Sequence, residues 1–142
     1  MAVRDLFGFW VEIDEEATRA WYAQADEWGC ECGDCRNFLT LARRRALPPP
    51  VLELLDKLGI PPEKATYVCE MYPAEGGHVY QFSWRIAGNI LGGGEKSGNS
   101  QGWGEASCLH EPYPYGAPGF PKPHFDLNFF IELPWALDEP RK

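Results

Sequence analysis

The sequence predicts an α+β fold, and three observations favour it. In residues 65–134, apolar and polar residues alternate, which is the period of strands with one buried face. Between residues 14 and 60 the apolar residues recur at helical spacing instead. Strands joined by short turns pair antiparallel, and helices grouped in one half of a chain cover one sheet face. We therefore expect an N-terminal strand and two to three helices packed on a mainly antiparallel sheet of about four to five strands.

The chain is expected to begin with a strand and a helix. Residues 7–13 alternate between apolar and other side chains, which predicts a strand. Asp14 is a suitable N-cap, and the two glutamates that follow it suit the positive end of a helix dipole. Apolar residues then recur at helical spacing as far as Trp28, and Gly29 is expected to end this helix.

Two further helices are expected before residue 60. One starts at or just after Asp34, because an apolar stripe follows at helical spacing. Three consecutive prolines then form a break, and Pro50 can occupy the first turn of the next helix. Gly59 is expected to end that helix.

The second half of the chain reads as four strands. Alternation is clearest in residues 80–86 and 125–133, and weaker in residues 67–71 and 103–109. Residues 88–104 contain seven glycines, which predicts a flexible loop. No linker composition divides the chain, so residues 1–142 are expected to form a single domain.

Charge and hydropathy narrow the class of protein. The 142 residues carry a net charge of −8, whereas nucleic-acid binding needs a basic surface. No run of 18 apolar residues is present, and residues 1–10 lack the apolar core of a signal peptide. We therefore expect a cytoplasmic protein that binds neither nucleic acid nor membranes, with a protein or a small molecule as its unidentified partner.

Three of the five cysteines lie within six residues. Cys30, Cys32 and Cys35 have the spacing C-x-C-x-x-C, and three thiolates on one turn can share a zinc ion. A structural zinc site needs a fourth ligand, for which Cys108 or His110 is our choice. Other candidates for this position are Cys69, His78 and His124. The sequence thus predicts a zinc-binding interaction or regulatory module.

Two alternatives remain open. Cys32 and Cys35 form a C-x-x-C pair at a helix start, where the dipole favours a thiolate and hence disulfide redox chemistry. The other alternative is a binding protein without cysteine chemistry, which would use exposed aromatic side chains. These aromatic residues are Trp10, Tyr72, Trp103, Tyr113, Tyr115 and Phe120.

Two segments partly match catalytic motifs, and neither match is complete. Gly94-Glu95-Lys96-Ser97 lacks the glycine that a P-loop places before its lysine. His110-Glu111 lacks the second histidine of a zinc-protease helix, and Pro112 would break such a helix. We predict no catalytic residue, and the sequence leaves open whether the protein is an enzyme.

Residues 30–64 carry a resemblance to a known family. The run C-x-C-x-x-C-R-N-F, which ends with Arg36, Asn37 and Phe38, is followed by a proline break and by the segment from Leu54 to Lys64. This combination resembles an uncharacterised family of small bacterial proteins of the Firmicutes type. The resemblance implies a bacterial cytoplasmic protein and no assigned activity.

Overall fold

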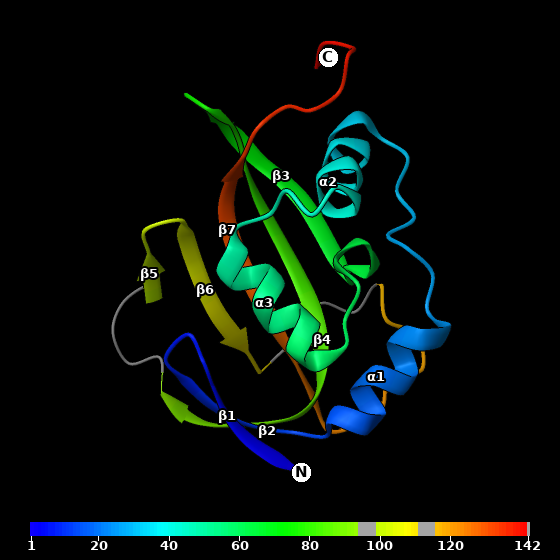
Figure 1. Cartoon of the computed structure of the whole chain (residues 1–142), viewed down its shortest axis with the longest axis vertical. Coiled ribbons are helices and arrows are strands. Elements are labelled where there is room, and N and C mark those ends of the chain that lie inside the picture. Colours follow the sequence, from blue (N-terminus) through cyan, green and yellow to red (C-terminus); the bar gives the residue numbers. More distant parts are fainter. Residues whose placement is uncertain (94–98, 111–115, 142) are drawn as a thin grey trace.

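The computed structural model describes residues 1–93, 99–110 and 116–141 (Figure 1). It confirms the α+β prediction, with more strands than expected. The helices are α1 (Glu15–Gln24), α2 (Gly33–Arg43) and α3 (Pro49–Leu58), followed by a 3₁₀ turn at Pro62–Lys64. The strands are β1 (Ala2–Leu6), β2 (Phe9–Ile13), β3 (Tyr67–Ala74), β4 (Gly77–Gly93), β5 (Asn99–Gln101), β6 (Gly104–Leu109) and β7 (His124–Leu133).

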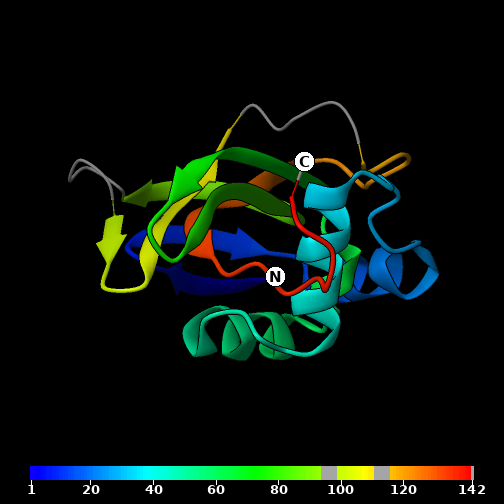
Figure 2. The ribbon, with the colours of Figure 1, turned by 90° about the horizontal axis from the view of Figure 1, so that it is seen from above.

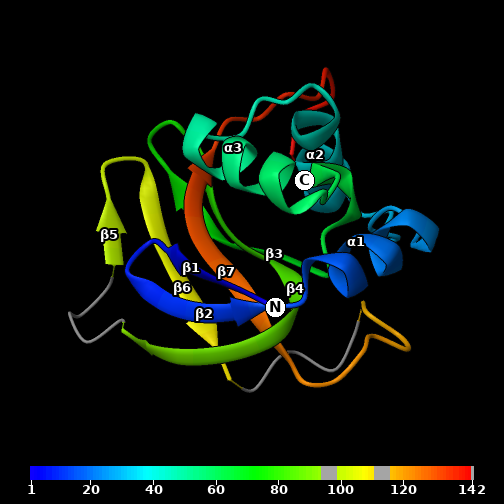
Figure 3. The same ribbon diagram turned by 60° about the horizontal axis from the view of Figure 1, so that its bottom comes forward.

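All seven strands belong to one antiparallel sheet with β4 at its centre. The order is β1-β2-β4-β7-β6-β5, and β3 also pairs with β4. The first half of β4 pairs with β3 and β7, and its second half pairs with β2. β4 curves strongly along its length (Figure 3). One long strand therefore connects the two parts of the sheet.

The flexible loop predicted for residues 88–104 is wrong for most of that range. β4 continues to Gly93, and β5 and the start of β6 lie at residues 99–104. Residues 94–98 are outside the described part of the chain. Glycine is needed at residue 88 because a Cβ there would lie 1.9 Å from the carbonyl oxygen of Glu12 on β2. These glycines therefore indicate close backbone approach as well as loops.

The predicted strand 7–13 is one arm of a hairpin. Phe7 and Gly8 both have positive φ, 52° and 95°, and form the turn between β1 and β2. The Phe7 ring lies 5.4 Å from Trp103 and 5.7 Å from Phe129, centroid to centroid. The hairpin thus folds over the inner face of the sheet.

The first helix is shorter than predicted. α1 ends at Gln24 rather than at Gly29, and residues 25–32 follow as an irregular linker. Lys64 Nζ donates to the carbonyl oxygen of Tyr22, and the backbone N–H of Trp28 donates to the carbonyl oxygen of Glu63. These bonds to the segment after α3 satisfy polar groups that a longer helix would use internally.

One hydrophobic core lies between the sheet and the helices. Alternate side chains of β4 and β7 face it, and α2 and α3 cover it with their apolar stripes. Figure 2 shows α3 on one side of the sheet. Phe38 of α2 lies 5.0 Å from Phe82 and 6.4 Å from Trp84 between ring centroids. This packing fixes the position of α2, which carries the cysteine cluster at its start.

Candidate metal centre

The three clustered cysteines lie where the linker after α1 enters α2. Cys30 and Cys32 belong to the linker and are exposed, whereas Cys35 is in the first turn of α2 and is buried. Their sulfur atoms all lie within 4.8 Å of one another. The structure therefore brings these three predicted ligands together.

Local hydrogen bonds explain why the cluster forms. Cys32 is the N-cap of α2, and its Sγ accepts the backbone N–H of Cys35 at 3.4 Å. Trp28 Nε1 donates to the Sγ of Cys35 at 3.1 Å. Because α1 ends early, the linker can return Trp28 to the start of α2.

The cysteines differ in their electrostatic surroundings. Hydrogen bonds lower the pKa of the Cys30 thiol. The bond from the Cys32 backbone N–H has the larger effect on this pKa, and the bond from the Cys35 thiol has the smaller one. Burial raises the pKa of the Cys35 thiol far above its ordinary value. The hydrogen bond from the Trp28 indole N–H lowers this pKa by a smaller amount. A metal ion at the cluster would therefore have to displace a firmly held proton from Cys35.

The geometry suits a metal ion that binds thiolates in a tetrahedral arrangement, such as zinc. Zinc–sulfur bonds of about 2.3 Å place two sulfurs of a tetrahedron about 3.8 Å apart. Three sulfurs within 4.8 Å can reach that spacing through small side-chain rotations. Among the described residues, no fourth histidine, cysteine or carboxylate joins this group.

The structure does not bring the predicted fourth ligands to the cluster. Cys108 is buried on β6, and burial followed by the charge of Asp5 raises its pKa to about 12. His110 is exposed just beyond the end of β6. The cluster lies beside β3, where the Trp28 ring is 6.4 Å from Tyr67. β4 and β7 separate β3 from β6, a distance of roughly 14 Å across the sheet.

The C-terminal segment that follows β7 packs beside the start of α2. The buried Asn37 side chain donates to the carbonyl oxygen of Pro134 at 3.0 Å and accepts the backbone N–H of Ala136 at 2.6 Å. Arg36 pairs with Glu139. No periodic pattern marked this contact, although Arg36 and Asn37 belong to the motif that carries the family resemblance.

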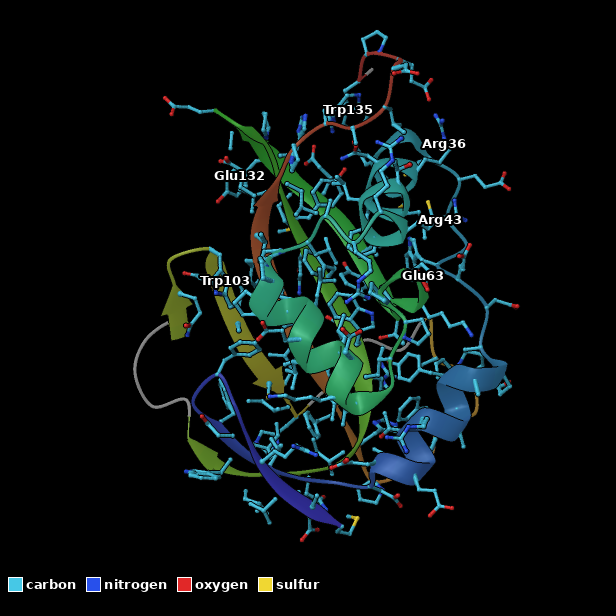
Figure 4. The ribbon with its side chains drawn as sticks, viewed as in Figure 1. Arg36, Arg43, Glu63, Trp103, Glu132 and Trp135 are labelled. Carbon is cyan, nitrogen blue, oxygen red and sulfur yellow. The ribbon has the colours of Figure 1, made fainter. Side chains whose placement is uncertain are left out.

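A cavity of about 330 Å³ lies between this segment and the start of α2, with Cys32 in its wall. Arg141 spans part of it, pairing with Asp34 at 2.8 Å and with Glu70 of β3. Figure 4 shows Arg36 on α2 and Trp135 on the C-terminal segment at the same end of the molecule. The other lining residues are Gly33, Asp34, Arg36, Trp135, Glu139 and Pro140.

The aromatic residues considered as a binding surface are dispersed. Trp10 and Tyr72 are exposed, Phe120 is buried, and Trp103 packs against the core. Tyr113 and Tyr115 lie outside the described residues. These positions do not form one aromatic patch among the residues that the structure describes.

Comparison with known proteins adds no relative. No protein-family model, curated protein or solved structure matches the chain. Within the described ranges, no helix has the length and apolar character needed to cross a membrane. The arrangement of the three cysteines is therefore the feature on which a functional proposal rests.

Proposed function

We propose that this protein is a cytoplasmic zinc-binding module in which Cys30, Cys32 and Cys35 hold one ion. The observation that carries the proposal is the convergence of three thiols within 4.8 Å where the linker enters α2. Thiolate is a preferred ligand of zinc, and three of them bind it far better than two. The proposal includes membership in the uncharacterised bacterial family whose cysteine motif the chain resembles.

The surroundings support a bound cation. The linker between α1 and α2 has no regular secondary structure. Because it carries Cys30 and Cys32, a zinc ion shared with Cys35 would hold it in place against α2. The hydrogen bond from Trp28 to the Cys35 sulfur is of the kind that orients a ligand from outside the coordination shell. A module organised in this way presents the linker and the C-terminal segment as a surface for a partner.

Metal analysis of protein purified from zinc-supplemented medium tests this function. We expect about one zinc per chain, and loss of that zinc in a variant with Cys30, Cys32 and Cys35 all changed to serine. Cys69→Ser is the matched control, because Cys69 is a free thiol on β3 outside the cluster. Metal-free wild-type protein, or zinc retained by the triple variant, would contradict the proposal.

A thiol–disulfide function is the second candidate. The Cys32 and Cys35 sulfurs belong to the same compact group, and Cys32 is the N-cap of α2, whose first turn contains Cys35. Mass spectrometry after mild oxidation of metal-free protein would detect a reversible bond between these two residues. If that bond forms and zinc does not bind, the redox function replaces the metal function.

A further inference from the structure

We infer that the cavity beside the cluster binds a small zwitterionic aminothiol of the cysteine class, whose thiolate is the fourth zinc ligand. This inference rests on the proposed zinc function and names the ligand that completes its site. It draws on three features: the number of protein ligands, the position of the cavity, and the charges in the cavity wall.

The number of protein ligands leaves one coordination position for an outside group. Zinc takes four ligands, and only three converge among the described residues. Cys30 and Cys32 are exposed, so this position can be reached from solvent. Zinc sites with three protein ligands commonly bind water or a substrate in the fourth position.

The cavity borders the cysteine cluster on one side. Cys32 is in its wall, and Gly33 and Asp34 continue the wall along the first turn of α2. A volume of about 330 Å³ is at the lower end for small-molecule sites and has room for an amino acid. The C-terminal segment contributes Trp135, Glu139, Pro140 and Arg141 to the wall, so one side of a bound molecule would contact an indole ring.

The charged groups of the wall match a zwitterion. Arg141 also pairs with Glu70 of β3, which is not part of the wall; the wall itself carries two arginine–carboxylate pairs, Arg36 with Glu139 and Arg141 with Asp34. All four side chains are at least one-quarter exposed, and exposed ion pairs contribute only about 0–1 kcal/mol. A ligand carboxylate can therefore take the place of a protein carboxylate on an arginine, while a ligand ammonium takes the freed carboxylate.

Binding would exchange ligands without any change of oxidation state. The thiol would release its proton to solvent, and the resulting thiolate would take the fourth position on zinc in place of water. The carboxylate and the ammonium keep their charges. The thiol supplies the bond to the metal, and the two charged groups supply selectivity for the aminothiol.

Cobalt-substituted protein provides the assay, because the visible spectrum of cobalt reports how many sulfurs coordinate it. We would titrate it with L-cysteine, cysteamine and S-methyl-L-cysteine, and then filter it to measure retained cobalt. L-cysteine should add a fourth sulfur with cobalt retained. Cysteamine, which lacks the carboxylate, should bind roughly tenfold more weakly, a loss of about 1.4 kcal/mol. S-methyl-L-cysteine should leave the spectrum unchanged.

Variants locate the ligand in the cavity. Arg36→Gln combined with Arg141→Gln should weaken L-cysteine about tenfold and leave cysteamine unchanged. Arg43→Gln is the matched control, because Arg43 is also on α2 but pairs with Glu27 outside this cavity. Equal binding of L-cysteine and cysteamine, or removal of cobalt by L-cysteine, overturns the inference. Absence of metal binding from the start contradicts the zinc function itself.

Discussion

Asn37 shows how one polar side chain can position a whole segment. Its side chain is fully buried, and its amide nitrogen donates to the hydroxyl of Tyr80 as well as to Pro134. Its amide oxygen accepts the backbone N–H of Ala136. Because buried polar groups are costly when unpaired, this amide fixes the C-terminal segment against α2.

Asn37→Ala should lower the free energy of unfolding by about 2–3 kcal/mol. Three hydrogen bonds are lost, and backbone groups of the C-terminal segment lose their partner. Urea denaturation measures the change. Arg36→Ala is the control, since its ion pair with Glu139 is exposed and its loss should cost less than about 1 kcal/mol. Equal effects of the two substitutions would refute this role of Asn37.

Stability should also depend on the buried ion pair between Arg85 and Asp126. Both side chains are at most 6% exposed, and Nε lies 3.0 Å from Oδ1. Asp126→Asn should cost about 3–5 kcal/mol, because it leaves the arginine charge buried without its partner charge. Thermal denaturation checks this, with Asp56→Asn as control. Asp56 pairs with Arg45 at the surface, so a comparable loss there would contradict the argument.

At the scale of elements, the bend of β4 depends on glycine. Gly88 has φ of +145°, and an added Cβ would lie 1.9 Å from a backbone oxygen of β2. Gly88→Ala should therefore cost about 3 kcal/mol or more in unfolding free energy. Gly92→Ala, in the same strand, adds a Cβ with no atom within 4 Å and should change stability little. Chemical denaturation of both variants measures the contrast, and similar losses would show that the close approach is unimportant.

Element boundaries could be predicted where the signals are local. The prolines before α3 and the left-handed Gly59 after it, with φ of 72°, place that helix correctly. The end of α1 could not be predicted this way. Trp28 continues the helical spacing but leaves the helix to bond the Cys35 sulfur and the Glu63 carbonyl. Such contacts join residues that the local pattern does not relate.

At the scale of the whole molecule, the local part of the candidate site could be predicted from the sequence, and the parts that depend on distant contacts could not. The spacing of Cys30, Cys32 and Cys35 was enough to predict their convergence, because a few residues of one turn fix it. The choice of Cys108 or His110 as a fourth ligand depended on strand order, and the sheet places two strands, β4 and β7, between β3 and β6. The C-terminal wall of the cavity depends on a buried amide and on ion pairs, which have no periodicity.

The whole fold should lose stability at alkaline pH, with Tyr80 as one cause. Burial raises its pKa to about 12, against a lowering by the hydrogen bond from Asn37, and its hydroxyl donates to the carbonyl oxygen of Asp34. Unfolded tyrosine ionises near pH 10, so this contribution is complete below about pH 10 and is lost as pH rises toward 12. Tyr22, also buried, has a raised pKa and adds to the same trend.

Urea denaturation at about pH 8 and about pH 11 tests this account. Tyr80→Phe should be about 1 kcal/mol less stable than the wild type at the lower pH, because the bonds to Asp34 and Asn37 are lost. Its further decline at the higher pH should be about 1 kcal/mol smaller than that of the wild type, because the substituted ring cannot ionise. Tyr72→Phe, at an exposed position on β3, should follow the wild type. If Tyr80→Phe declines as steeply as the wild type, burial of this hydroxyl does not contribute to the alkaline transition.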